Sequence, residues 1–315
     1  DGDGRISWED FAAALPREFW AEAVERIARE VPDTLLLAEA FWMMEGYFVR
    51  ELGMHRVYNS AFMHMLRDQS NQKYRGIIKE ALANAPAILE RFVNFMNNPD
   101  EDTAVAQFGQ GDKYFGVVTL MATMPGLPMF GHGQIEGYAE KYGMEYARPY
   151  QDEQPDQGLV DHHARVLFPL LRKRHVFGGV ANFNIFDAHR SEGWVDENVY
   201  VLSNRTYDSA ERALVVFNNH HQDTAVWIHG SAPVNVGDED APTRVTRSLV
   251  EALDLKVEAG LLYGLYEIHS GLWFIRDPAE VRDQGLFVGL KPYGTQVFLE
   301  FRELHDHDGR WRRLK

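Results

Sequence analysis

Carboxylates and amides that directly follow short apolar runs are the residues of this sequence best suited to chemistry. Glu39 follows the apolar run 35–38, and Asn98 and Asp100 follow the run 92–96. A single carboxylate after a strand is also typical of a helix cap or a solvated turn, but here the arrangement recurs. Two carboxylates at strand ends can act as a protonated acid and its ionised partner. We therefore begin from the carboxylates Glu39 and Asp100.

The elements that must position these residues are strands alternating with helices. Apolar runs of strand length recur along the first part of the chain, and between them apolar residues repeat at helical spacing. Such alternation predicts βα units and a parallel sheet, and four units make half of a (β/α)8 barrel. The expected strands are 35–38, 54–62, 92–96 and 126–131, and the expected helices are 16–31, 77–89, 111–123 and 159–175.

Beyond about residue 180 the sequence changes to short β-type runs separated by turns. These runs are 199–202, 213–217, 225–228, 261–268, 272–275, 286–288 and 295–301. Short strands at such spacing predict an antiparallel β-sandwich. We therefore expect an α/β fold followed by an all-β fold, with the C-terminal portion of a barrel in residues 1–180 and a β-sandwich domain in residues 181–315.

Composition restricts the partners of this chain. Its 315 residues carry a formal net charge of -15, which argues against nucleic acid or an anionic membrane surface and favours neutral or weakly polar ligands. No apolar run reaches the ~20 residues of a membrane span. The absence of cysteine excludes disulfides and thiolate chemistry and leaves the compartment open. The chain begins at Asp1 rather than methionine, so we expect it to be part of a longer protein.

The segment 1–11 resembles the later part of a calcium-binding loop of the EF-hand type. Its spacing places Asp1, Asp3 and Asp10 as ligands of a structural Ca²⁺, with Gly4 at the turn. The first ligand of such a loop would precede residue 1, and Asp10 stands where a glutamate is usual. The alternative interpretation is an acidic turn that caps the following helix. We expect no other cofactor.

Four motifs in order along the chain resemble the later barrel strands of the α-amylase superfamily. They are Glu39, Asn98-Pro99-Asp100, the run 125–128 and the segment Gly133-Gln134-Ile135-Glu136. The segment 168–175 resembles the last barrel helix of that superfamily, and the β region resembles its C-terminal domain. Segments 45–50 and 138–146 look most like bacterial glycosidases related to maltosyltransferases. The resemblance covers nearly the whole chain and implies the second half of a TIM barrel.

The resemblance implies roles for particular residues. Glu39 would be the general acid/base that protonates the glycosidic oxygen, and Asp100 would hold sugar hydroxyls and stabilise the oxocarbenium-like transition state. An apolar setting beside Phe41 and Trp42 would favour the protonated form of Glu39. The substrate-binding residues that the resemblance implies are Trp42, Tyr58, Asn59, Asn98, Phe130, His132 and Gln134, with Phe62 as a further aromatic able to stack on a sugar ring. For each aromatic the alternative is core packing.

Two departures from the superfamily pattern bear on activity. The superfamily's nucleophile is an Asp in an Arg-x-Asp segment after the fourth strand, and nothing before Leu35 matches it. We therefore expect the half of the barrel that holds the nucleophile to lie upstream of Asp1, and this chain to be inactive alone. Pro99 stands where the superfamily has a substrate-binding histidine, and proline has no side-chain donor.

Three functions remain open. The first is a retaining glycosidase or transglycosidase acting on α-glucans or maltooligosaccharides. The second is a maltosyl or glucosyl transferase that uses the same site with a sugar hydroxyl or phosphate as acceptor. The third is a carbohydrate-binding or scaffold protein that has lost the chemistry, which Pro99 favours. Because a half barrel has an unpaired strand edge, we also expect the isolated chain to be poorly soluble.

Overall fold

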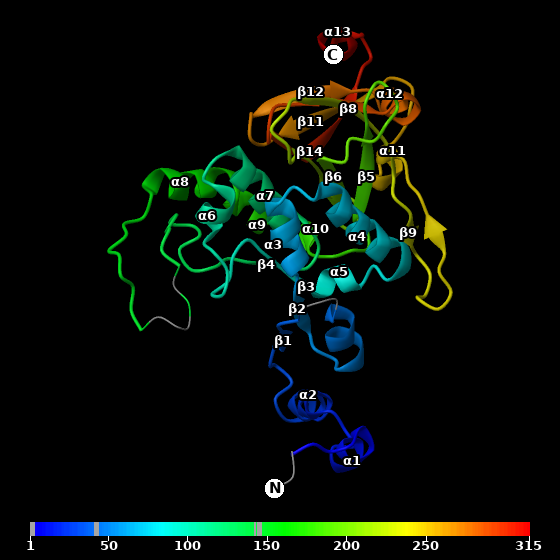
Figure 1. The fold of residues 1–315 in the computed structure, drawn as a ribbon. Coiled ribbons are helices and arrows are strands. Elements are labelled where there is room, and N and C mark those ends of the chain that lie inside the picture. Colours follow the sequence, from blue (N-terminus) through cyan, green and yellow to red (C-terminus); the bar gives the residue numbers. More distant parts are fainter. Residues whose placement is uncertain (1–3, 41–43, 142, 144–146) are drawn as a thin grey trace.

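Two sheets of different kinds organise the protein, which is described by a computed structural model over residues 4–40, 44–141, 143 and 147–315. The first sheet has four parallel strands, and the second has eight strands paired antiparallel (Figure 1). The helices that accompany the parallel sheet end at Phe177, and the antiparallel strands begin at Asn184. The predicted order, α/β followed by all-β, is confirmed.

The parallel sheet is half of a barrel. Its strands are β1 (Leu37–Ala38), β2 (Arg56–Tyr58), β3 (Phe92–Phe95) and β4 (Leu127–Met129), and they are hydrogen-bonded in chain order. Ala38 is paired with Val57, Tyr58 with Val93, and Phe95 with Met129. Because all four strands are parallel, their carboxyl ends lie at one edge of the sheet.

Helices precede, connect and follow these strands. They are α1 (Trp8–Ala14), α2 (Phe19–Glu30), the π-helix η1 (Tyr47–Glu51), α3 (Ser60–Arg67), α4 (Asn71–Asn84), α5 (Ile88–Arg91), α6 (Ala104–Phe108), α7 (Asp112–Thr123), α8 (Gln157–Val166), α9 (Phe168–Leu171) and α10 (Arg174–Phe177). Of the described helices, none is long and apolar enough to cross a membrane.

Several predicted elements differ from the observed ones. The expected helix 77–89 begins earlier, at Asn71, and is divided into α4 and α5 near Pro86. The expected strand 54–62 is a strand only over Arg56–Tyr58, because Asn59 caps helix α3 by accepting a hydrogen bond from the Phe62 amide. Phe62 is 0% exposed and packs in the main core, which is the alternative given for each aromatic residue. The expected helix 159–175 is divided into α8, α9 and α10, with a proline in the first turn of α9.

The antiparallel strands form one continuous sheet. Its strands are β5 (Asn184–His189), β6 (Val199–Arg205), β7 (Arg212–Asn218), β8 (Thr224–Ser231), β11 (Leu261–Glu267), β12 (Leu272–Arg276), β13 (Leu286–Leu290) and β14 (Thr295–His305), in the spatial order β12-β11-β14-β7-β6-β5-β8-β13. Residues of both edge strands, such as Phe274 of β12 and Val288 of β13, line one cavity of about 230 Å³. The sheet is therefore curled, with its two edges facing each other.

Short elements complete the β domain. They are the antiparallel pair β9 (Val234–Asn235) and β10 (Arg244–Val245) and the helices α11 (Leu249–Ala252), α12 (Pro278–Gln284) and α13 (Arg310–Leu314). Buried side chains of α11, with Val281 of α12, pack inside the curl against strand residues such as Val226 and Ile228. The inside of the curl is therefore a second hydrophobic core.

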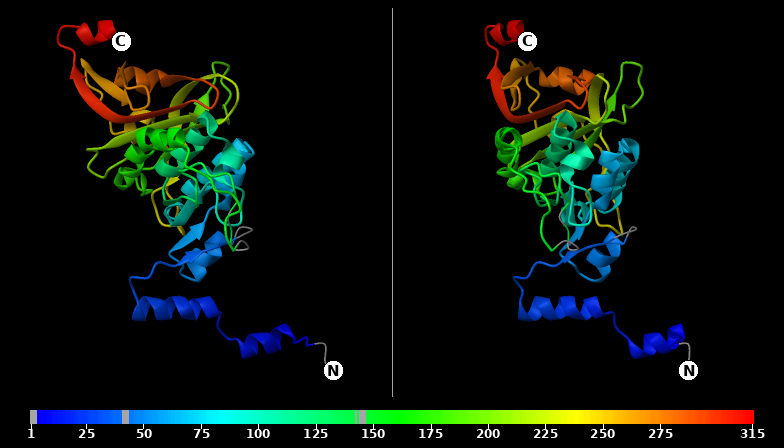
Figure 2. Two further views of the ribbon diagram at one scale, coloured as in Figure 1. Left: turned by 90° about the vertical axis from the view of Figure 1, so that its left-hand side faces the viewer. Right: turned by 60° about the vertical axis from the view of Figure 1, so that its left-hand side comes forward.

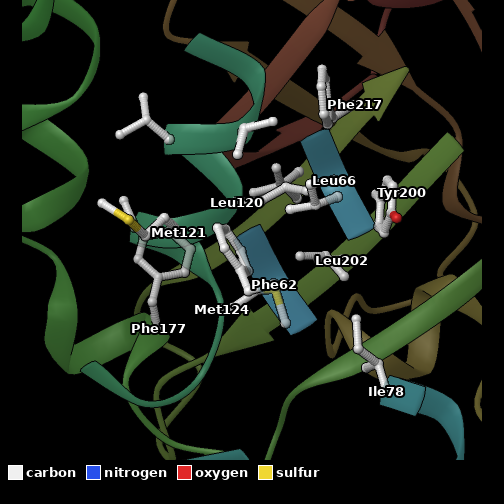
Figure 3. Packing of buried hydrophobic residues seen from close by; sticks show 14 of the residues in the cluster. Phe62, Leu66, Ile78, Leu120, Met121, Met124, Phe177, Tyr200, Leu202 and Phe217 are labelled. Atoms are coloured by element: carbon white, nitrogen blue, oxygen red, sulfur yellow. The ribbon is translucent and has the colours of Figure 1, made fainter. Parts of the chain in front are cut away.

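The barrel helices and the outer face of the curled sheet share the main hydrophobic core. Phe62 and Leu66 of α3 and Leu120 of α7 belong to the same buried cluster as Tyr200 of β6 and Phe217 of β7. Figure 3 shows these side chains meeting between the helices and the antiparallel strands. Since the two parts bury apolar surface against each other, we expect them to unfold together.

Gly116 of α7 marks the tightest approach at this interface. A Cβ at Gly116 would lie 1.9 Å from the buried ring of Phe217, whereas a Cβ at the exposed Gly76 of α4 would meet nothing within 4 Å. We expect Gly116→Ala to destabilise the protein by roughly 1–3 kcal/mol through overpacking. The matched Gly76→Ala substitution should instead stabilise it by about 1 kcal/mol, since alanine favours the helix. Urea unfolding of both variants tests this, and an equal effect of the two would contradict it.

A buried ionic cluster also joins the two parts. The Arg75 guanidinium of α4 is 0% exposed, forms an ion pair with Asp187 of β5, and donates to the backbone oxygens of Phe186, Asp196 and Val199. Lys79, one turn along α4, contacts the same Asp187 carboxylate. This arrangement fixes α4 on the outer face of the antiparallel sheet.

Three histidines, His162 and His163 of α8 and His269 of the β11–β12 turn, predict how stability depends on pH. Burial lowers the pKa of His163, whose ring contacts the Tyr114 hydroxyl (2.8 Å) and the Leu159 carbonyl (2.8 Å). Burial is also the main cause of the lowered pKa of His162 and of His269. A base with a lowered pKa in the folded state binds protons more weakly than in the unfolded chain. Stability should therefore fall as the pH drops below about 6.5, the ordinary pKa of histidine.

Thermal unfolding between pH 7 and pH 5 measures this effect. We expect the melting temperature to fall over that range, and His163→Gln to make the fall smaller, because glutamine takes up no proton. Replacing His307, which is exposed beyond β14, with Gln serves as the control and should leave the slope unchanged. A His163→Gln slope equal to that of the wild type would contradict the prediction.

The N-terminal helices extend away from the rest of the molecule (Figure 2). Helix α1 buries no residue, and α2 contacts the body through Ala21 and Val24, which pack against a small cluster that includes Met54 and Val57. Trp8 and Phe19 are strongly exposed. These two helices therefore carry a large apolar surface that the described residues do not cover.

Candidate active site

The carboxyl edge of the parallel sheet gathers most of the described site residues predicted from the sequence. Glu39 follows β1, Asn59 follows β2, Asn98 and Asp100 follow β3, and the segment 130–134 follows β4. Since neighbouring strands lie about 4.8 Å apart, these loops share one surface. Trp42 and Phe41 lie outside the described residues.

Tyr58 lies between the two predicted catalytic carboxylates. Burial raises the pKa of the Tyr58 hydroxyl, and the negative charges of Glu39 and Asp100 raise it further. Its ring packs against Phe95, with centroids 5.0 Å apart. The strand order β1-β2-β3 places Tyr58, at the end of the middle strand, between the loops that carry Glu39 and Asp100.

Glu39 and Asp100 are both exposed to solvent. The apolar setting predicted for Glu39 depends on Phe41 and Trp42, which lie outside the described residues, so it stays a prediction. β1 pairs with β2, and within the described chain its other edge has no strand beside it. The open side of the half barrel explains the exposure of Glu39.

Asn98 shapes the turn that presents Asp100. Its side-chain oxygen accepts hydrogen bonds from the backbone amides of Asp100 and Glu101, both at 3.0 Å, and the residue is only 8% exposed. Lys141, from the segment after β4, donates to the Asp100 backbone oxygen (2.7 Å). Asp100 is therefore held from both sides, and the contacts of Asn98 are those of a positioning residue.

Asn59 is buried in a polar network rather than directed to solvent. Its two N–H groups donate to Asn94 Oδ1 (2.8 Å) and to the Tyr74 hydroxyl (3.3 Å), and its oxygen caps α3. Asn94 of β3, 1% exposed, donates in turn to the Pro125 backbone oxygen (3.2 Å). These bonds engage both N–H groups of Asn59 and tie together three strand ends. Asn94 is a site residue that sequence reasoning missed, because it lies inside an apolar run.

The three predicted binding residues after β4 differ in exposure. Gln134 is 2% exposed, and its side-chain oxygen accepts from the Gly131 amide (3.2 Å). Phe130 is half-buried against the main core, while His132 is exposed with its ring 5.9 Å from that of Tyr138. Of these three residues, His132 is placed best to meet a ligand.

Two carboxylates, Glu140 and Glu153, accept backbone hydrogen bonds within the described parts of the connection between β4 and α8 (Figure 1). Glu153 accepts from the backbone amides of Ala139 (2.7 Å) and Glu140 (3.0 Å). Glu140 accepts from those of Tyr150 (2.6 Å) and Gln151 (2.8 Å). The sequence does not predict these hydrogen bonds, because each glutamate bonds to backbone amides that lie 10 to 14 residues away from it in the chain.

The predicted calcium site stays a prediction. Asp1 and Asp3 lie outside the described residues, and Asp10 stands in the first turn of α1, where its carboxylate accepts from the Ser7 hydroxyl (2.7 Å). That contact fits the alternative interpretation, in which the acidic turn caps a helix. No group of three carboxylates or histidines able to hold a metal is found within the described parts of the chain.

Comparisons with known proteins identify the fold. No family model and no curated sequence matches this chain. Among solved structures it is similar to an Anoxybacillus α-amylase (TM-score 0.58, 14% identity, 89% of this chain and 55% of that one). It is also similar to a Nostoc punctiforme debranching enzyme soaked with acarbose (0.59, 13%, 91% and 55%) and to a maltogenic α-amylase from Thermotoga neapolitana (0.60, 10%, 96% and 60%).

The chain thus spans between 55% and 60% of the length of these structures. Matching nine-tenths of this chain to little more than half of theirs is what a C-terminal part of the same fold would give. The resemblance inferred from the motifs around Glu39 and Asp100 is confirmed at the level of the fold.

Proposed function

We propose that this chain is part of a retaining enzyme that acts on the α-glucosidic bonds of α-glucans. The chain has the fold of the C-terminal part of α-amylase-family enzymes. The observation that carries the proposal is that Glu39 and Asp100 follow the strands on either side of Tyr58, at the carboxyl edge of the parallel sheet. Support also comes from the solved structures of this fold, which include amylases and a debranching enzyme.

In this proposal Glu39 is the general acid and base. Its protonated carboxyl donates to the leaving glycosidic oxygen, and its carboxylate then takes a proton from the incoming hydroxyl. Asp100 holds the hydroxyls of the sugar and stabilises positive charge at the anomeric carbon. Tyr58, half-buried between them, provides an aromatic ring that a sugar can stack on.

The nucleophile of a retaining mechanism is expected from a segment outside this sequence. Such a nucleophile must lie about 5 Å from the acid. The solvent-exposed side of Glu39, next to the unpaired edge of β1, is where we place it. Closure of the sheet on that side would also enclose both carboxylates and exclude water.

Pro99 favours a second candidate, a carbohydrate-binding homologue without catalysis. It stands exposed beside Asp100 and offers no hydrogen bond to a sugar. In that case glucan would bind at the same edge without being cleaved.

Turnover of an α-1,4-glucan by the complete gene product that carries this chain tests the proposal. Free reducing sugars indicate hydrolysis, and longer or rearranged oligosaccharides indicate transfer to a sugar hydroxyl. Binding of maltooligosaccharide without any turnover would favour the second candidate. Neither binding nor turnover would reject both.

A further inference from the structure

The curled β domain holds a cavity of about 230 Å³ between its two edge strands, β12 and β13. Its wall is mostly apolar and includes Leu265 of β11, Phe274 of β12, Leu286 and Val288 of β13, and Phe298 of β14. All five side chains belong to the hydrophobic core inside the curl or pack against it. An apolar cavity of ~150 Å³ is already large enough to bind benzene. This cavity therefore suits one aromatic ring or a medium-length alkyl chain.

The cavity can be entered from solvent between the two edge strands. Within the described sheet β12 and β13 are the end strands, and they are not paired with each other. Phe287 and Gly289 of β13 line the cavity and are both exposed. A ligand can therefore reach the inside of the curl without opening the sheet.

Arg276, at the end of β12, brings a positive charge to this apolar cavity. It is paired across the sheet with Tyr263, which belongs to the inner core, so both side chains lie on the inner face of the curl. Its guanidinium donates to the Ile275 backbone oxygen (2.9 Å) and lies 5.6 Å from the centre of the Phe274 ring. Burial lowers the pKa of Arg276. Within the described chain this guanidinium has no carboxylate partner.

The carboxylates closest to Arg276 are held by other cations. Glu280, whose charge acts against the effect of burial on the Arg276 pKa, forms an ion pair with Lys315. Asp277 caps α12 by accepting from the Ala279 amide (2.9 Å) and lies 3.5 Å from the Arg312 guanidinium. A cation withdrawn from water is normally paired. Arg276 therefore lacks an anion, and a guanidinium binds a carboxylate through two parallel hydrogen bonds.

Gln296 of β14 adds a second polar group to the cavity. It is paired with Val216 of the inner core, so its side chain also lies on the inner face of the curl. The residue is half-buried, and its side-chain amide makes no hydrogen bond to another described residue. Such an amide can donate to a carboxylate oxygen. An apolar pocket with a few polar groups is typical of a small-molecule site.

We propose that the cavity between β12 and β13 binds a small amphiphilic monoanion, a carboxylate that carries one aromatic ring or a medium-length alkyl chain. The carboxylate would pair with Arg276, and the apolar group would pack against Phe274 and Val288. The net charge of -15 disfavours a ligand with several negative charges. The site lies in the β domain and shares no residue with the carboxyl edge of the parallel sheet, so the inference does not depend on the proposed function.

Equilibrium binding to the complete gene product that carries this chain tests the site without any measurement of activity. Calorimetric titration with octanoate, below the concentration at which it forms micelles, should give saturable binding. Acetate has the carboxylate without the chain, and octanol has the chain without the charge, so each should bind at least about tenfold more weakly. Titration with phenylpropanoate compares a ring with the alkyl chain, and saturable binding of either acid supports the site.

Substitutions in the cavity locate the binding. Arg276→Gln should weaken octanoate binding at least about tenfold and change octanol binding less than about threefold. Val288→Phe fills part of the cavity and should weaken the binding of both compounds. The control is Arg302→Gln, at an exposed arginine of β14 that pairs with Glu300 outside the cavity, and it should have no effect. Circular dichroism verifies that each variant is folded.

Several results would overturn the proposed site. They are the absence of saturable binding by either acid, octanoate binding no tighter than that of acetate or octanol, and equal octanoate binding by Arg276→Gln and Arg302→Gln. The comparison of probes uses the unmodified protein, so it decides the question even where a variant does not fold. Failure of these binding tests leaves the α-glucan proposal unaffected, and a lack of glucan turnover leaves the proposed site unaffected.

Discussion

Glu39→Gln should lower α-1,4-glucan turnover by the complete gene product by roughly 10²–10⁴-fold, the range expected when a general acid is removed. Glutamine has the shape of glutamate but donates no proton to the glycosidic oxygen and accepts none from the incoming hydroxyl. Because Glu39 is exposed at the sheet edge, the substitution should leave the folded structure unchanged. Steady-state rates on maltooligosaccharides, with circular dichroism to verify folding, measure the effect.

A substrate that needs no acid separates the role of Glu39 from a general loss of function. Fluoride leaves without protonation, so the formation of the glycosyl-enzyme from α-glucosyl fluoride should suffer far less in Glu39→Gln than cleavage of a glucan. Asp102→Asn is the matched control, since Asp102 is an exposed carboxylate two residues after Asp100. Glucan turnover that survives Glu39→Gln as well as it survives Asp102→Asn would exclude Glu39 as the acid.

Arg75→Met should reduce the free energy of unfolding by about 3–5 kcal/mol, because it removes a fully buried guanidinium that pairs with the partly exposed Asp187 and donates to three backbone oxygens. The guanidinium is 0% exposed, and its loss leaves the Asp187 carboxylate with Lys79 alone. The backbone oxygens of Asp196 and Val199, which accept from Arg75 at 3.1 and 2.7 Å, would lose these bonds inside the interface.

Urea unfolding at neutral pH measures this loss. The control is Arg302→Met, which removes an exposed arginine that pairs with Glu300 at 2.8 Å and should cost less than about 1 kcal/mol. Similar losses for the two variants would show that the cluster around Arg75 does not join the barrel helices to the antiparallel sheet.

Much of the architecture could be predicted because it follows from hydrophobic periodicity. The runs 92–96 and 126–131 contain β3 and β4, and the pattern 111–123 matches α7 within one residue. The segment 54–62 misled because Val57, Tyr58, Ala61 and Phe62 look like one short apolar run with polar residues near its end. In the structure Asn59 interrupts that run, and Phe62, Met63 and Leu66 then face the core at helical spacing.

The candidate site could be predicted only in part. Glu39 and Asp100 lie at the same edge of the sheet because parallel strands align their carboxyl ends, which strand order alone implies. The contacts of Asn59 and Asn98 could not be foreseen, because an amide looks the same in a sequence whether it caps a turn or faces a ligand. The hydrogen bonds from backbone amides to Glu140 and Glu153 could not be predicted for a similar reason, because every residue except proline has a backbone amide.

The described parallel sheet has an unpaired strand edge on each of its two sides, and the proposed enzyme could be divided into two parts there. Among the described strands β1 pairs only with β2, and β4 pairs only with β3. A complementary half that offers a parallel strand to each edge would complete the barrel whether or not the two halves share a chain. As separate polypeptides they would behave as a split enzyme, with activity that follows mass action between the halves and declines on dilution.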